Sequence, residues 1–186
     1  MKEQAILVTI GIAAFLIAAR PASAQLNSAE STASLTAVLA ESLTVTLLPA
    51  AVSFTLTGGS STNAGNVAIA ATTAWELSVT RTNLSLFGYF SIAATALAHT
   101  AVTNTVDIPS ARVEVAVNGG ALAPFNQTVV FGAASAGRQL FSQAITVGTA
   151  SGSRADTLAL NINLGSYGLP ADTYTGTLRI RAQATP

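Results

Sequence analysis

The chain has 186 residues, with 8 basic and 8 acidic side chains, a formal net charge of zero, one histidine and no cysteine. Without cysteine, disulfides, thiolate zinc sites and lipid attachment through a cysteine are all excluded. With only 9% charged residues, no basic patch for nucleic acid or anionic lipid is expected. We therefore expect no nucleic-acid partner.

The first 24 residues have the order of a secretory signal peptide. A short polar start with Lys2 precedes the apolar segment 5–19, and Ala22-Ser23-Ala24 forms a small-residue cleavage site. The apolar segment is short for a transmembrane helix, which makes a retained membrane anchor the less favoured alternative. We predict a signal-peptide helix over residues 1–24, cleavage after Ala24, and a secreted or extracytoplasmic chain (periplasm or cell surface) with no further membrane span.

The mature chain begins with small polar residues and then alternates. Residues 25–33 are expected to be a flexible tail, and residues 34–186 a single domain. From Leu35 to Leu47 apolar residues recur at every second position, which is typical of a strand with one buried face. Glu41 interrupts that face, marking a bend, a bulge or the point where one half leaves the sheet.

Further alternating segments predict many more strands. Gly88 inside one of them indicates a bulge or a close backbone approach, and Asn118-Gly119-Gly120 predicts a tight turn. Residues 93–108 are ambiguous. The strands are expected at residues 52–56, 67–72, 74–81, 84–92, 113–117, 128–131, 139–147, 157–164 and 173–182. This pattern favours an all-β fold, an immunoglobulin-like antiparallel β-sandwich, with a closed barrel as the alternative.

The last hairpin carries a family resemblance. The run Pro170-Ala-Asp-Thr-Tyr174-Thr-Gly-Thr-Leu-x-Ile resembles the terminal hairpin of bacterial secreted immunoglobulin-like domains, especially the pilin-like, spore-coat-protein-U type. The likeness covers about 14 residues, Leu169 to Ala182. In immunoglobulin-like folds a tyrosine near this corner ties its hydroxyl to the backbone, which makes Tyr174 a candidate tyrosine corner.

The resemblance implies assembly by strand addition, in which the N-terminal arm of one subunit fills a groove in the next. Leu35, Ala37 and Leu39 form the candidate strand-exchange arm, and the chain ends shortly after Ala182, as if strand 173–182 had an uncovered side. Pilins of this type usually carry a disulfide, and this chain departs from them in having no cysteine. The alternative is that residues 35–47 form the first strand of their own sandwich.

Reactive chemistry is sparse in the sequence. His99 is expected in an exposed loop, without the partners of a zinc site or a Ser-His-Asp triad. The acidic residues are scattered singly, and the loop Gly58–Gly65 lacks the lysine of a phosphate loop. We expect no catalytic residues, no metal and no cofactor.

Two functions follow as hypotheses. The first is a non-catalytic structural or surface-assembly protein, such as a fimbrial or pilin-like subunit, whose partners are further copies or related surface subunits. The second is a carbohydrate- or cell-envelope-binding sandwich module, with Phe87, Tyr89 and Phe90 as a sugar-stacking platform. Exposed aromatic rings on a flat face favour the second, and an open groove beside strand 173–182 with a detached arm favours the first.

Overall fold

The computed structural model describes residues 29–90, 94–125 and 137–186, so the predicted signal peptide and the predicted strand 128–131 lie outside the described residues. The chain divides into two units, Met1–Ala37 and Val38–Pro186. In the first unit, residues 29–37 are exposed and have no regular secondary structure. All the strands that the structure describes belong to the second unit.

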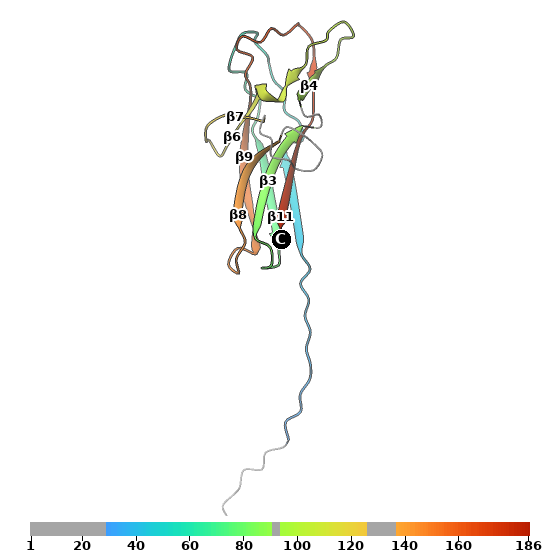
Figure 1. The fold of residues 1–186 in the computed structure, drawn as a ribbon, viewed down its shortest axis with the longest axis vertical. Helices are drawn as coiled ribbons and strands as arrows, with labels where there is room; N and C mark the ends of the chain where they lie inside the picture. Colours follow the sequence, from blue (N-terminus) through green and yellow to red (C-terminus); the bar gives the residue numbers. More distant parts are fainter. Residues whose placement is uncertain (1–28, 91–93, 126–136) are drawn as a thin grey trace, which may run out of the picture. The chain divides into compact units, whose positions relative to one another are not determined.

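The second unit is built from antiparallel sheets (Figure 1). The largest sheet has the order β1-β2-β9-β6-β7, formed by Ser42–Leu48, Ile69–Glu76, Ser151–Ile162, Val113–Val117 and Ala123–Pro124. The second has the order β11-β3-β8, formed by Leu178–Thr185, Asn83–Phe90 and Gly137–Ala144. The third has the order β10-β4-β5, formed by Tyr174–Thr175, Thr95–His99 and Ile108–Pro109, and the 3₁₀ turn Ser110–Arg112 follows. The described strands do not close into a barrel, so the barrel alternative is wrong and the all-β, sandwich-like architecture is confirmed.

Two-residue alternation builds the core. In β2 every second residue from Ile69 to Trp75 is buried while Ala70 and Thr72 face solvent, as expected for a strand with one dry face. The opposing sheet contributes Leu84 and Leu86, both fully buried, from β3. Burial of each such side chain stabilises the fold by roughly 1.5–3 kcal/mol. Because the domain has no disulfide, this core is its main source of stability.

Several strands differ from the predicted ones. The predicted strand 52–56 contributes only an isolated bridge between Phe54 and Gly65. The predicted strands 67–72 and 74–81 are one strand, β2, because Thr73 points inward and is fully buried. By contrast, β6 has the predicted bounds and is followed by the predicted turn, in which Asn118 and Gly119 have φ of 52° and 74°.

The predicted strand 173–182 is split at Gly176. Its first part, β10, pairs with β4, and its second part, β11, pairs with β3, so the chain passes from one sheet to another. At the passage the backbone of Gly176 lies so close to that of Ala96 that a Cβ would overlap the Ala96 carbonyl. A residue with a side chain cannot make this approach. The irregularity expected at Gly88 lies nearby and not at that residue: the β3–β8 register shifts between Leu86 and Phe87, while Gly88 pairs regularly with Arg138.

We predict that Gly176→Ala lowers the free energy of unfolding by about 1–3 kcal/mol, the usual range for an overpacked site. Gly168→Ala is the matched control, because a Cβ there meets no atom within 4 Å, and its effect should stay within about 0.5 kcal/mol. Urea denaturation of the two variants measures the difference. Equal stability of both would show that the passage at Gly176 has no steric constraint.

Candidate functional site

An uncovered seam lies where two sheet edges meet. Among the described strands, β1 pairs only with β2 and β11 pairs only with β3, so each is the edge of its sheet. The two edges lie next to each other, with blue β1 beside dark red β11 in Figure 1. Ser42, at the start of β1, lines the same hollow as Ala182–Ala184 near the end of β11. Leu47, near the end of β1, lines a second hollow together with Leu178 at the start of β11. The edges therefore run antiparallel without a ladder that joins them.

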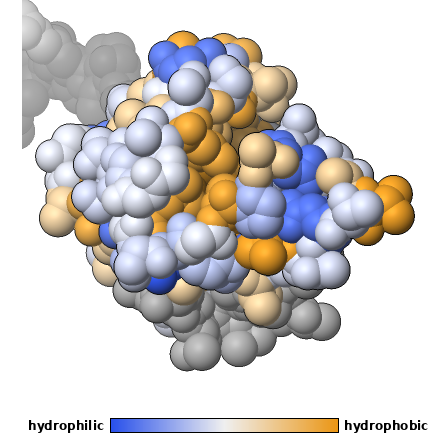
Figure 2. All heavy atoms as spheres, turned by 90° about the horizontal axis from the view of Figure 1, so that it is seen from above, coloured by the Kyte–Doolittle hydropathy of each residue, from blue (hydrophilic) through white to orange (hydrophobic). Residues whose placement is uncertain are grey.

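One end of the seam opens into an apolar hollow of about 270 Å³. Its walls include core side chains from both large sheets, among them Ile69, Leu160 and Phe90, together with Leu47 of β1 and Leu178 of β11. Figure 2, seen from the β4 end of the molecule, shows apolar surface in a hollow between paler, more polar residues. The hollow exposes the interior of the sandwich at the seam.

The other end of the seam is polar. A second hollow of about 320 Å³ lies between the start of β1 and the second half of β11, and Arg81 and Arg181 line it. Here the Glu41 carboxylate accepts hydrogen bonds from the Ser78 backbone at 2.7 Å and from Arg81 at 2.8 and 3.1 Å. These bonds, from Arg81 first and Ser78 second, lower the pKa of Glu41 to about 2. We call this ion pair with its backbone bond the Glu41 clasp.

The opposite side of the sandwich is closed by an ion pair. Asp156 of β9 is buried and accepts hydrogen bonds from Arg154 at 2.7–2.9 Å and from Asn118 at 2.7 Å. The Arg154 guanidinium also lies over the Phe141 ring of β8, 4.5 Å from its centre. Burial raises the pKa of Asp156, but the bonds from Arg154 and Asn118 outweigh this and lower it overall. The sheets are thus tied together on the β8–β9 side and open on the β1–β11 side.

The candidate arm is exposed. Leu35 is 95% and Leu39 80% exposed, Ala37 is also exposed, and residues 29–41 have no strand assignment. Strand β1 begins at Ser42, directly after Glu41, whereas the sequence predicted one alternation from Leu35 to Leu47. The interruption at Glu41 is therefore the point where the regular strand starts. Val38, which has the opposite parity, is 88% exposed as well.

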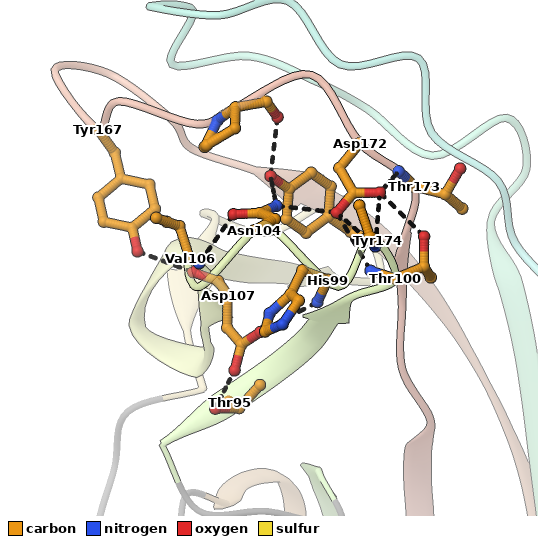
Figure 3. Close-up of polar contacts among 12 residues, drawn as sticks. Thr95, His99, Thr100, Asn104, Val106, Asp107, Tyr167, Asp172, Thr173 and Tyr174 are labelled. Carbon is orange, nitrogen blue, oxygen red and sulfur yellow. Dashed lines mark hydrogen bonds and ion pairs between the residues drawn. The ribbon is translucent and has the colours of Figure 1, made fainter.

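Tyr174 lies in a polar network at the β4 end of the domain (Figure 3). Its hydroxyl donates to the Pro170 carbonyl at 2.8 Å and accepts from the Asn104 amide at 3.0 Å. Asp172 accepts from Asn104, from the backbone of Thr173 and, across the network, from the segment 100–101. The bond from Asn104 first, and those from the backbone and Thr100 after it, hold the pKa of Asp172 far below its usual value. The network fixes the chain just before the passage at Gly176.

His99 belongs to the same end of the domain and is not in an exposed loop. It lies in β4, its side chain is 31% exposed, and its Nδ1 lies 2.6 Å from Asp107 Oδ1. The Asp107 carboxylate also accepts from the His99 backbone, and both bonds lower the pKa of Asp107. Tyr167 donates its hydroxyl to the Asp107 carbonyl at 2.7 Å. These contacts tie the segment around Asp107 to β4 and, through Tyr167, to the loop after β9.

The aromatic residues of β3 do not form an exposed platform. Phe87 and Phe90 are buried, and Phe90 packs edge-on against Phe125 with ring centres 5.1 Å apart. Tyr89 is only partly exposed. Both phenylalanines are therefore core residues and not part of an exposed sugar-stacking platform.

Within the described ranges, no three histidine or acidic side chains group as they would around a metal ion. A search of the same residues finds no helix with the length and apolar character needed to span a membrane. The chain matches no protein-family model, and no curated protein is significantly similar to it in sequence.

Sequence reasoning missed the long-range partners of this site. Asp172 bonds the backbone of its neighbour Thr173, as a local turn would, but its partner Asn104 lies 68 residues away. Likewise Glu41 was recognised as an interruption, whereas its partner Arg81 lies 40 residues away. In both cases the signal was a lone acidic residue in an otherwise neutral segment.

We predict that Asp172→Asn flattens the loss of stability in acid. The folded-state pKa of Asp172 lies below the value of about 3.9 in an unfolded chain. Its contribution is therefore complete above about pH 4 and is lost as the pH falls through the lower folded-state pKa. Thermal melts of both proteins between about pH 6 and pH 2 should show a shallower decline for the variant.

Tyr174→Phe is the matched comparison, because it removes a hydrogen bond of the same network but no carboxylate. It should cost about 1 kcal/mol in the free energy of unfolding, and leave the acid dependence as in the unmodified chain. If Asp172→Asn and the unmodified chain lose stability in parallel, the network does not set the acid sensitivity.

Proposed function

We propose that the protein is a secreted, non-catalytic structural protein of a bacterial cell surface, and that its copies assemble by strand addition. In this proposal the domain is an immunoglobulin-like, pilin-like sandwich related to spore-coat-protein-U-type domains, and residues 1–24 direct export. The observation that carries the proposal is the uncovered apolar seam between β1 and β11. The occupant is the arm around Leu35, Ala37 and Leu39 of a second copy.

The seam supports strand addition for two reasons. An unpaired strand edge presents a row of backbone donors and acceptors that an added strand can satisfy. Here two such edges flank one hollow whose walls are core side chains. A strand that entered the seam would pair with backbone and place every second side chain in the hollow.

The arm supplies the matching pattern. Its three apolar residues recur at every second position, as required for side chains on one face of a strand. Burying Leu35 and Leu39 in a neighbouring seam would contribute roughly 1.5–3 kcal/mol each. In the described structure these side chains are exposed, so the single copy lacks this stabilisation.

The bond from Tyr174 to the Pro170 carbonyl supports the immunoglobulin-like part of the proposal, since a hydroxyl bonded a few residues upstream is the mark of a tyrosine corner. The glycan-binding alternative has less support, because Phe87 and Phe90 are committed to the core.

We predict that the double substitution Leu35→Ser and Leu39→Ser abolishes assembly without loss of stability, because both side chains are exposed in the single copy. Val102→Ser with Val147→Ser is the matched control, since these valines are 99% and 87% exposed outside the arm. Size-exclusion chromatography with light scattering and electron microscopy of the processed chain should show oligomers or filaments for the unmodified chain and the control only.

A complementation test identifies the two halves of the contact. Thr177→Trp fills the hollow from its rim and should block acceptance while the arm stays intact. Alone, the Thr177→Trp chain and the serine arm variant should each be monomeric, but a mixture of the two should form dimers of one copy of each. An unmodified chain that remains monomeric at every concentration, particularly one that binds insoluble glycan, would overturn the proposal.

A further inference from the structure

The Glu41 clasp lies where the exposed arm meets the first strand. Glu41 directly precedes β1, and its parity is that of Leu43, Val45 and Leu47, the inward-facing residues of that strand. The residue that precedes these inward-facing side chains at the same parity is therefore the carboxylate of Glu41. That carboxylate is held by the Ser78 backbone and Arg81 in the connection between β2 and β3.

The clasp constrains the path of the chain before β1. Its three hydrogen bonds, at 2.7–3.1 Å, fix Glu41 to the connection that follows β2, the strand on the paired side of β1. The seam lies along the other edge of β1, and its polar hollow reaches the clasp, because Glu41 and Arg81 both line it. To enter the seam of its own domain, the arm would have to reverse direction immediately before Ser42, so that Glu41 or its neighbour Ala40 would lie in the turn.

We propose that the Glu41 clasp prevents the arm from closing on the seam of its own domain and thereby directs it to the seam of a second copy. This inference rests on the proposed function and adds its regulation. A tight reversal at residues 40–41 would change the backbone at Glu41, whose side chain is bonded to Ser78 and Arg81. Between two copies no reversal is needed, because the arm and the seam belong to different chains.

Strand direction makes the two outcomes different. An arm that folds back from Ser42 runs antiparallel to β1 and hence parallel to β11, because the two edges run antiparallel. An arm from a second copy is free to run in the opposite direction, antiparallel to β11 and parallel to β1. The clasp thus disfavours closure of the arm within one copy and favours exchange between copies.

The chain's lack of cysteine gives a direct test. Ala37→Cys in the arm and Ala182→Cys in the seam are introduced together into the processed chain, which is oxidised and run on a non-reducing gel. Closure within one copy gives a cross-linked monomer of altered mobility, whereas exchange between copies gives a ladder. With the clasp intact we expect the ladder to dominate.

Adding Glu41→Gln should shift the products toward the cross-linked monomer by about three- to five-fold, the size expected for an exposed ion pair. Arg81→Gln should act in the same direction. Glu76→Gln is the control, since that carboxylate accepts from Ser151 on the neighbouring strand outside the clasp, and it should leave the ratio unchanged.

The failures are distinguishable. If the ladder persists unchanged in both clasp variants but disappears with Leu35→Ser and Leu39→Ser, the clasp proposal is wrong and strand addition stands. If neither cross-linked product forms in any variant, the arm does not enter a seam at all and both proposals fail. A melting temperature within a few degrees of the unmodified chain for Glu41→Gln would show that the shift reflects arm choice and not unfolding.

Discussion

Backbone hydrogen bonding is the constraint on which the rest of this structure depends. Every strand needs a partner on both sides unless it faces water, and a sandwich that is not closed must leave edges. Here the edges of the two large sheets, β1 and β11, lie together and leave core residues open between them. The proposed assembly of the exposed aliphatic arm with a second copy depends on this seam.

The ion pairs on the two sides of the sandwich differ in how deeply they are buried. On the β8–β9 side, the only acidic group that is fully buried among the described residues, Asp156, is paired with Arg154, which also covers Phe141. A buried pair of this kind is costly to break, because one partner alone would remain in the interior uncompensated. On the β1–β11 side the pair between Glu41 and Arg81 is solvent-exposed, and such pairs contribute little and exchange easily. The buried pair suits a permanent contact between the two sheets. The exposed pair suits a contact that can break and re-form.

The sequence was sufficient where information is local. Alternation at Val113–Val117 and the turn after it predicted β6 and its end. It was insufficient where tertiary contacts decide. The merger of two predicted strands at Thr73 reflects burial, and the split at Gly176 reflects the approach of Ala96 from a distant strand. For the candidate site, the arm was visible in the sequence, but the seam it would fill arises only from the order of strands in space.

The passage at Gly176 has a consequence for how the domain opens. One continuous segment supplies β10 to the small sheet and β11 to a large one, so neither can detach without loosening the other. Local opening in proteins proceeds in cooperative units, and this passage joins two sheets into one such unit. Amide hydrogens of Tyr174–Thr175 and Leu178–Thr185 would then exchange with solvent together, at a rate set by the combined stability of the two pairings.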